Sequence, residues 1–243
     1  MNQHQFLYRN TVFYFILFFG FALWAFWGSY YSRLTDQPTF HNHTHGILMT
    51  LWCWMLIAQA WLIRNNKRKW HRIIGKASYM LVPLLIISTL RLIHFRLSPA
   101  KTFLPDIVLS NFALMLNATI IFALIYGLAI YYRKDALTHA RFMLCTIFPL
   151  FTPITDRIIF GNFRWLVQYA PTIDRYPIVP VFGFALANVI LIALSIWDWR
   201  KNKRLIFPLV LGILLIYHIS VLSFHNLIFW KALAKWFLHL PLS

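Results

Sequence analysis

The stretch F-H-N-H-T-H-G-I-L-M-T-L-W-C-W-M-L-I-A-Q-A-W-L-I, residues 40–63, determines the fold that we predict. Its part from His45 to Ile63 is almost wholly apolar, and about 20 such residues in a helix are needed to cross the hydrocarbon core of a bilayer. Histidines alternate at the start of the stretch, at positions 41, 43 and 45. The stretch therefore predicts a transmembrane helix that carries imidazole groups at one end.

Six further segments are similarly long and apolar. They are Val12–Tyr31, Ala77–Phe95, Ile107–Tyr131, Phe142–Phe160, Ile178–Trp197 and Leu205–His225. Hydrophobic residues make up 60% of the 243-residue chain and charged residues only 12%, whereas about a quarter of a soluble domain is charged. We therefore predict an all-α, polytopic membrane bundle of about seven transmembrane helices, with residues 1–243 forming a single domain.

The basic residues indicate the orientation of the chain. With the N-terminus inside, fourteen of the 23 Lys and Arg residues fall on the inner side, mainly in residues 64–76, 133–141 and 200–204. Cytoplasmic loops carry such an excess, so we predict an inner N-terminus and an outer C-terminus. The formal net charge of +17 lies in short runs between apolar segments. This pattern is typical of contact with lipid headgroups, and we expect the lipid bilayer, not nucleic acid, as the partner.

Six histidines fall in the outer half of this topology, and four of them lie within or at the ends of apolar runs: His45, His94, His218 and His225. An ionisable side chain in hydrocarbon usually faces the bundle interior or binds something, because its exposure to lipid is costly. Imidazole is also the commonest metal ligand. We predict these four residues as metal ligands that converge in one polar cavity. His218 and His225 lie about 10 Å apart along a helix, so each would pair with a histidine from another helix.

Two residues of the first quoted stretch are predicted to support this site. Met49 and Gln59 share one helix face with His45, Trp52 and Leu56, because these residues follow one another at intervals of three or four. The face carries imidazole, thioether, indole and amide groups, which lipid does not favour. We expect it to point into the bundle.

Asp156 and Arg157 are predicted to support the same site from another helix. They follow Pro149 and Pro153 in the chain. Proline removes a backbone donor and kinks a helix, which frees carbonyls for polar partners. We expect a kink before this acid–base pair and a position for the pair near the outer end of its helix.

Two histidine–arginine pairs begin predicted spans on the inner side, His71 with Arg72 and His139 with Arg141. The start of a helix favours anions because its backbone N–H groups are unpaired. We predict these four residues as a cofactor-binding set, with the imidazoles as axial ligands of heme b and the arginines on its propionates. A phosphate-headgroup site and simple interfacial anchoring are the alternatives for the same residues.

These residues also carry a resemblance to a family of bacterial polytopic inner-membrane proteins without an assigned reaction. The family pattern has a histidine that opens a span, a Gln-x-x-Leu-Ile-Arg ending, a His-Arg-x-x-Gly motif and a later His-x-x-x-Met motif. Here it corresponds to His43 or His45 with Gly46, to Gln59–Arg64, to His71–Tyr79 and to His139–Met143. The resemblance covers about residues 40 to 160 and implies a multi-pass protein of the bacterial inner membrane.

Two families of known chemistry are similar at fewer residues. Bis-histidine membrane cytochromes b hold heme between helices, and His71 with His139 resembles such a pair. The ceramidase and adiponectin-receptor superfamily of seven-helix zinc hydrolases is similar in helix number and in pairing a histidine of an early span with histidines on the seventh helix. That family has a His-x-x-x-His motif, whereas this chain has Leu222, not a second histidine, four residues after His218.

The predicted function is a membrane protein with a histidine-lined intramembrane site that binds heme b or a transition metal and transfers electrons. A redox protein or a quinone would be its partner. The first alternative is a zinc-dependent membrane hydrolase, in which Asp156 orients a group or takes a proton. The second alternative is a cofactor-free membrane subunit or assembly factor, in which the histidines are structural.

Overall fold

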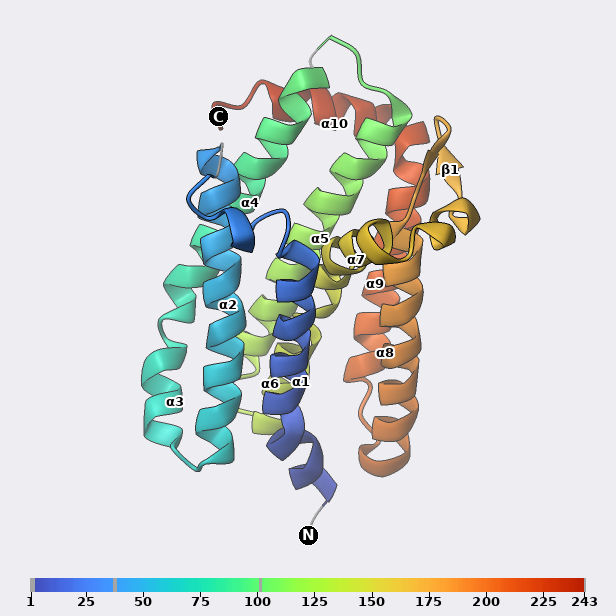
Figure 1. Ribbon diagram of the computed structural model, residues 1–243. Helices are drawn as coiled ribbons and strands as arrows, with labels where there is room; N and C mark the ends of the chain where they lie inside the picture. Colours follow the sequence, from blue (N-terminus) through green and yellow to red (C-terminus); the bar gives the residue numbers. More distant parts are fainter. Residues whose placement is uncertain (1–2, 37–38, 101, 243) are drawn as a thin grey trace. The chain divides into compact units, whose positions relative to one another are not determined.

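The computed structural model describes residues 3–36, 39–100 and 102–242, and these are almost entirely helical (Figure 1). The α-helices are α1 (Gln3–Phe26), α2 (Phe40–Arg64), α3 (Arg68–Gly75), α4 (Ser78–Leu97), α5 (Asp106–Tyr131), α6 (Ala136–Cys145), α7 (Phe151–Asn162), α8 (Pro180–Asn202), α9 (Ile206–Ser223) and α10 (Ile228–Leu238). Short 3-10 helices span Tyr31–Arg33, Ser98–Ala100, Phe148–Leu150, Arg164–Tyr169 and Phe224–Asn226. The strands β1 (Thr172–Ile173) and β2 (Tyr176–Pro177) form an antiparallel hairpin between α7 and α8.

Six helical segments within the described ranges are long and apolar enough to cross a membrane. They are Phe40–Arg64, Arg68–Ala100, Asp106–Tyr131, Ala136–Asn162, Pro180–Asn202 and Ile206–Asn226. The predicted class, an all-α chain with several membrane-crossing helices, is thus confirmed. The predicted segment Val12–Tyr31 extends past the end of α1 at Phe26. The apolar part of α1, Asn10–Phe26, is shorter and reaches about 26 Å. The number of seven spans stays a prediction.

The chain divides into two compact units, Met1–Leu92 and Ile93–Ser243, and the boundary falls within α4. In the first unit α1 and α2 lie side by side (Figure 1). The ring of Phe19 on α1 meets the ring of Trp54 on α2 edge-on at 5.6 Å. Helix α3 also packs against α2. The prediction of a single domain is not tested by this division and stays a prediction.

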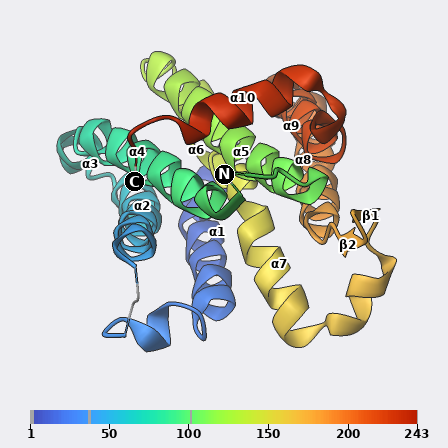
Figure 2. The same ribbon diagram turned by 90° about the horizontal axis from the view of Figure 1, so that it is seen from above.

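In the second unit α9 packs against both α5 and α8, and Figure 2 shows α8 and α9 side by side. The buried hydrophobic residues of α9, from Phe207 to Val221, recur at intervals of three or four and form one apolar stripe. Helix α10 lies across the end of α5 (Figure 1). There the indole N–H of Trp230 donates to the Leu109 carbonyl at 3.1 Å.

The predicted interruption before Asp156 is confirmed. Helix α6 ends at Cys145, a 3-10 turn contains Pro149, and α7 starts again at Phe151. Pro153 lies in the first turn of α7, where its missing N–H has no intrahelical partner to lose. One predicted span is therefore two short helices joined by a turn.

Helix α2 starts earlier than the predicted range that began at His45. It begins at Phe40, so the three alternating histidines belong to its first two turns. The apolar pattern located only the lipid-compatible part, because hydropathy does not report the polar first turn of a helix. The inward face is confirmed for Trp52, Leu56 and Gln59, which are buried, and His45 and Met49 are half-buried.

Candidate functional site

In the first unit, Gln59 of α2 joins the two ends of the His71–Gly75 segment of α3. With its amide oxygen toward Gly75, Gln59 accepts from the Gly75 N–H at 3.1 Å and donates to the His71 carbonyl at 3.0 Å. The same amide nitrogen lies within hydrogen-bonding distance of His71 Nδ1. Gln59 was predicted to support the outer histidines and His71 to bind heme. The structure brings these two residues together at one end of α2, where the contact fastens α3 to α2.

His45 lies farther along the first unit, against α4. Its Nδ1 is 3.4 Å from the Ser88 hydroxyl and 3.3 Å from the Thr89 hydroxyl. Both hydroxyls also donate to the Leu85 carbonyl at 2.8 Å. A hydroxyl that donates to a carbonyl can still accept a hydrogen bond, so Nδ1–H of His45 can donate to this pair. That arrangement leaves Nε2 as the acceptor nitrogen of the ring.

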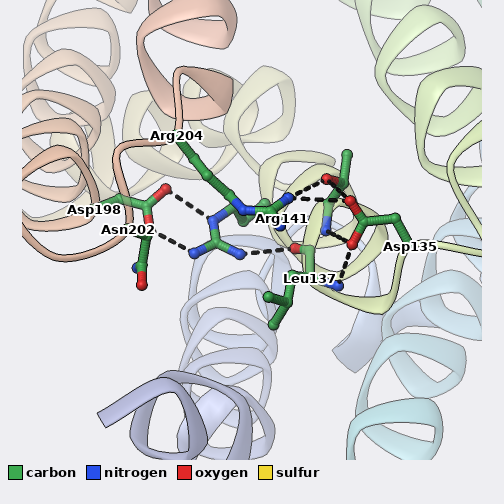
Figure 3. Close-up of polar contacts among 7 residues, drawn as sticks. Asp135, Leu137, Arg141, Asp198, Asn202 and Arg204 are labelled. Carbon is green, nitrogen blue, oxygen red and sulfur yellow. Dashed lines mark hydrogen bonds and ion pairs between the residues drawn. The ribbon is translucent and has the colours of Figure 1, made fainter.

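In the second unit the most extensive buried polar contact is the ion pair between Arg141 of α6 and Asp198 of α8 (Figure 3). Their side chains are 1% and 0% exposed. Arg141 Nε donates to Asp198 Oδ2 at 2.8 Å, and Nη2 donates to Oδ1. Arg141 Nη1 also donates to the Leu137 carbonyl at 2.9 Å. The paired fork geometry of guanidinium and carboxylate satisfies both charges away from water.

A second, more exposed contact lies next to this pair (Figure 3). Asp135 caps the start of α6 by accepting from the backbone N–H groups of Leu137 and Thr138. Its other oxygen accepts from the Thr138 hydroxyl at 2.7 Å and from Arg204 at 3.1 Å. The Thr138 hydroxyl, and next the Arg204 guanidinium, hold the pKa of the Asp135 carboxyl well below its ordinary value. The loop before α9 is thereby tied to the start of α6.

His139, which was predicted as a heme ligand, lies on α6 between Thr138 and Arg141 in the sequence. Its Nδ1 is 2.7 Å from the carbonyl of Ala129, which belongs to the last turn of α5. A carbonyl only accepts, so Nδ1 carries the proton and Nε2 is the basic nitrogen of the ring. His71 and Arg72, the other predicted pair, belong to the first unit.

A third polar group lies on α7, α8 and α9, within membrane-crossing segments. Asp156 of α7 has a buried carboxylate oxygen, Oδ1, without a hydrogen-bond partner. The neighbouring Arg157 donates to the Pro153 carbonyl at 2.9 Å, and Arg96 lies within electrostatic range of Arg157. The region thus combines one carboxylate with two guanidinium groups.

Asn188 and His218 join this group from α8 and α9. The amide nitrogen of Asn188 lies 3.3 Å from His218 Nδ1, and the amide oxygen of Asn188 is buried without a partner. The His218 ring stacks on Phe184, with centroids 4.0 Å apart and an interplanar angle of 21°. The imidazole is therefore held by an amide at its edge and by an aromatic ring on its face.

Tyr217 and Thr152 connect Asp156 to the other two helices. The Tyr217 hydroxyl donates to the Leu114 carbonyl at 3.2 Å, and Thr152 and Asp156 lie close enough to act on it electrostatically. The Tyr217 ring meets Phe184 edge-on at 5.5 Å. Close approach of α7 and α8 depends on Gly183, because a Cβ there would lie 2.5 Å from Thr155 Oγ1 and 3.1 Å from the Thr152 Cα. We call Thr152, Asp156, Asn188, Tyr217 and His218 the α7–α9 site.

The two remaining predicted ligands lie elsewhere in the second unit. His94 Nε2 is 3.3 Å from the Leu238 carbonyl, its ring lies 5.9 Å from that of Phe237, and its Nδ1 is buried without a partner. His225, in the 3-10 turn after α9, is also buried with an unpartnered Nδ1.

The predicted residues thus occupy several separate surroundings. Among the residues that the structure describes, no three His, Cys, Asp or Glu side chains are grouped so that they could hold a metal ion. Asp156 and His218 share the α7–α9 site, whereas His45 belongs to the first unit. The common cavity predicted for the four outer histidines stays a prediction.

Sequence reasoning missed Asp198, Asn188 and Tyr217. A signal was present for the first two, because an aspartate at the end of an apolar run and an amide in the middle of one are both costly in hydrocarbon. Tyr217 gave no such signal, since tyrosine is common in apolar segments and only its partners show its role.

Comparisons of the chain with protein-family models, with curated proteins and with solved structures find no match. The function is therefore inferred from the contacts of the residues described above.

Proposed function

We propose that this protein is a multi-pass protein of the bacterial inner membrane, with seven spans, an inner N-terminus and an outer C-terminus. The basic runs at residues 64–76, 133–141 and 200–204 support this orientation. Asn66→Cys and Asn162→Cys variants should be labelled by an impermeant thiol reagent from opposite sides, with Asn162→Cys labelled from outside. The native Cys53 and Cys145 are free and buried, so they provide a low background. Equal labelling of both variants from outside would rule out the seven-span arrangement.

We further propose that the α7–α9 site binds a membrane-soluble hydroquinone and takes up its protons while a separate redox protein accepts its electrons. The observation that carries this proposal is the pair of buried acceptor oxygens without partners, Asp156 Oδ1 and Asn188 Oδ1. A buried acceptor without a donor is unfavourable by about 1–3 kcal/mol, so a ligand that brings hydrogen-bond donors gains free energy at both oxygens.

A hydroquinone has the chemistry that this site favours. It carries two O–H donors on an aromatic ring and partitions into hydrocarbon, where lipid acyl chains offer no donors. The stacked rings of Phe184 and His218 and the edge of Tyr217 supply aromatic contacts. Asp156 and His218 can each accept a proton from a bound hydroxyl, as ionisable groups within membranes commonly do in proton relays.

Binding is tested with the full chain in lipid nanodiscs under reducing conditions, by titration with decylubiquinol and with its dimethyl ether. The ether lacks both O–H donors. It should bind at least about tenfold more weakly, because the loss of one hydrogen bond to a charged group lowers affinity by about that factor. Asp156→Ala should weaken quinol binding by a similar factor. Asp106→Ala is the matched control, because Asp106 pairs with Lys231 at an exposed position. Equal affinity for quinol and ether, or unchanged binding by Asp156→Ala, would disprove the proposal.

A second candidate function is heme ligation by His139. The favouring observation is the bond from Nδ1 to the Ala129 carbonyl, because heme and metal ligands are commonly oriented through their second nitrogen in this way. Heme would supply a one-electron centre in which the protein sets the potential through the ligand and its burial. Arg141 does not fit as a propionate partner here, since Asp198 already neutralises its charge.

The optical spectrum and the metal content of the purified protein test this candidate. A heme-bearing protein should be red, with a Soret band that changes on reduction by dithionite, and His139→Ala should lose the low-spin spectrum. His45→Ala tests in the same way whether the outer histidines hold heme. A colourless protein with about one zinc per chain would favour the hydrolase alternative, and a colourless, metal-free protein would leave the cofactor-free subunit or assembly factor.

A further inference from the structure

Helix α3 carries three distinct faces. With 100° between successive residues, His71 and Gly75 fall on one side, Trp70, Ile73 and Ile74 on a second, and Arg68, Lys69, Arg72 and Lys76 on a third. The first face is the one that Gln59 of α2 holds. Because that contact fixes the rotation of α3, the other two faces point away from α2.

The second and third faces are exposed, except for the half-buried Ile74. Trp70 is 55% and Ile73 is 49% exposed, and the four basic residues of the third face are exposed as well. We call the exposed residues of these two faces the α3 ledge: Arg68, Lys69, Trp70, Arg72, Ile73 and Lys76. It places a cationic strip directly beside an apolar one.

Within the first unit, no carboxylate lies near the positive charge of the α3 ledge. Asp36 is the only acidic residue in residues 1–92. It precedes α2, whereas α3 follows the opposite end of that helix, about 37 Å away along the axis. Two neighbouring basic residues are differently engaged, since Arg64 lies over the Phe13 ring at 4.8 Å and Lys67 over the Trp61 ring at 4.9 Å. The four cations of the ledge therefore have no anionic partner within the first unit, and a ligand from outside the chain can supply one.

We infer that the α3 ledge binds the headgroup of an anionic phospholipid. Arginine matches phosphate oxygens through its planar fork and lysine contributes a point charge. Trp70 and Ile73 provide the apolar contact that the glycerol and upper acyl chain of a lipid require, and tryptophan is enriched at this depth of the membrane. The ledge follows the C-terminal end of membrane-crossing α2, where headgroups are available. This inference does not depend on the proposed function of the α7–α9 site.

Native mass spectrometry of the detergent-solubilised full chain tests the inference by titration with phosphatidylglycerol and phosphatidylcholine. Phosphatidylglycerol should bind more tightly to the wild type. Each basic residue near a membrane surface contributes roughly fivefold to binding, so Lys69→Gln/Arg72→Gln should weaken phosphatidylglycerol binding by about 25-fold. The charge-preserving variant Lys69→Arg/Arg72→Lys should retain most of the affinity.

The matched control removes the same charge from another basic loop. Arg133→Gln/Lys134→Gln changes two exposed residues that lie in the turn between α5 and α6, not on a helix, and it should leave binding nearly unchanged. An equal loss in this control, or equal affinity of the wild type for the two lipids, would overturn the inference. Displacement of phosphatidylglycerol by millimolar inorganic phosphate would also overturn it, because it would indicate a site for the free anion. Loss of binding in the charge-preserving variant would count against it too.

Discussion

The buried ion pair of Arg141 and Asp198 allows a quantitative test. Asp198→Asn removes the charge but keeps the side-chain shape, so the Arg141 guanidinium, 1% exposed, is left without its counter-charge. Removing one partner of a buried ion pair lowers the free energy of unfolding by about 3–5 kcal/mol. The unfolding equilibrium should shift by roughly a hundred- to several thousandfold, since about 1.4 kcal/mol corresponds to tenfold.

Equilibrium unfolding of the full chain in mixed micelles, titrated with dodecyl sulfate and followed by tryptophan fluorescence, measures this change. Asp106→Asn is the comparison, because its pair with Lys231 is 37% and 46% exposed and contributes only about 0–1 kcal/mol. The double variant Arg141→Met/Asp198→Leu should be near the wild type or more stable. If Asp198→Asn is no more destabilising than Asp106→Asn, the electrostatic argument for the buried pair is wrong.

Two further predictions concern the second unit. Because the folded pKa of Asp135 lies below its ordinary value of 3.8, the wild type should melt at a higher temperature than Asp135→Asn above about pH 4. This difference should vanish as the pH falls through the folded pKa, and a difference that grows on acidification would contradict the assignment. Gly183→Ala should destabilise the protein by about 1–3 kcal/mol through overpacking against Thr155. Gly212→Ala, whose Cβ meets nothing within 4 Å, should be neutral or stabilising by up to about 1 kcal/mol, and equal melting temperatures for the two glycine variants would refute the packing argument.

The membrane helices follow from the sequence because the bilayer imposes a local rule. Every backbone group in hydrocarbon must be bonded within its own helix, so an apolar run of sufficient length identifies a span without knowledge of its neighbours. The same local logic located the inward face with Trp52 and Gln59 and the interruption near Pro149. It did not locate α3, since this short basic helix has no apolar run and its stability depends on packing against α2.

The partners of the polar residues could be decided only by the tertiary structure. Arg141 and Asp198 are 57 positions apart in sequence, and Asn188 and His218 are 30 apart, so no periodicity within one helix predicts either contact. The sequence identified Arg141, Asp156 and His218 as notable because charged and imidazole groups in apolar segments are costly wherever they point. Which group satisfies each of them depends on how the helices pack, and helix packing is set by interhelical contacts such as the approach of α7 to Gly183, which hydropathy does not encode.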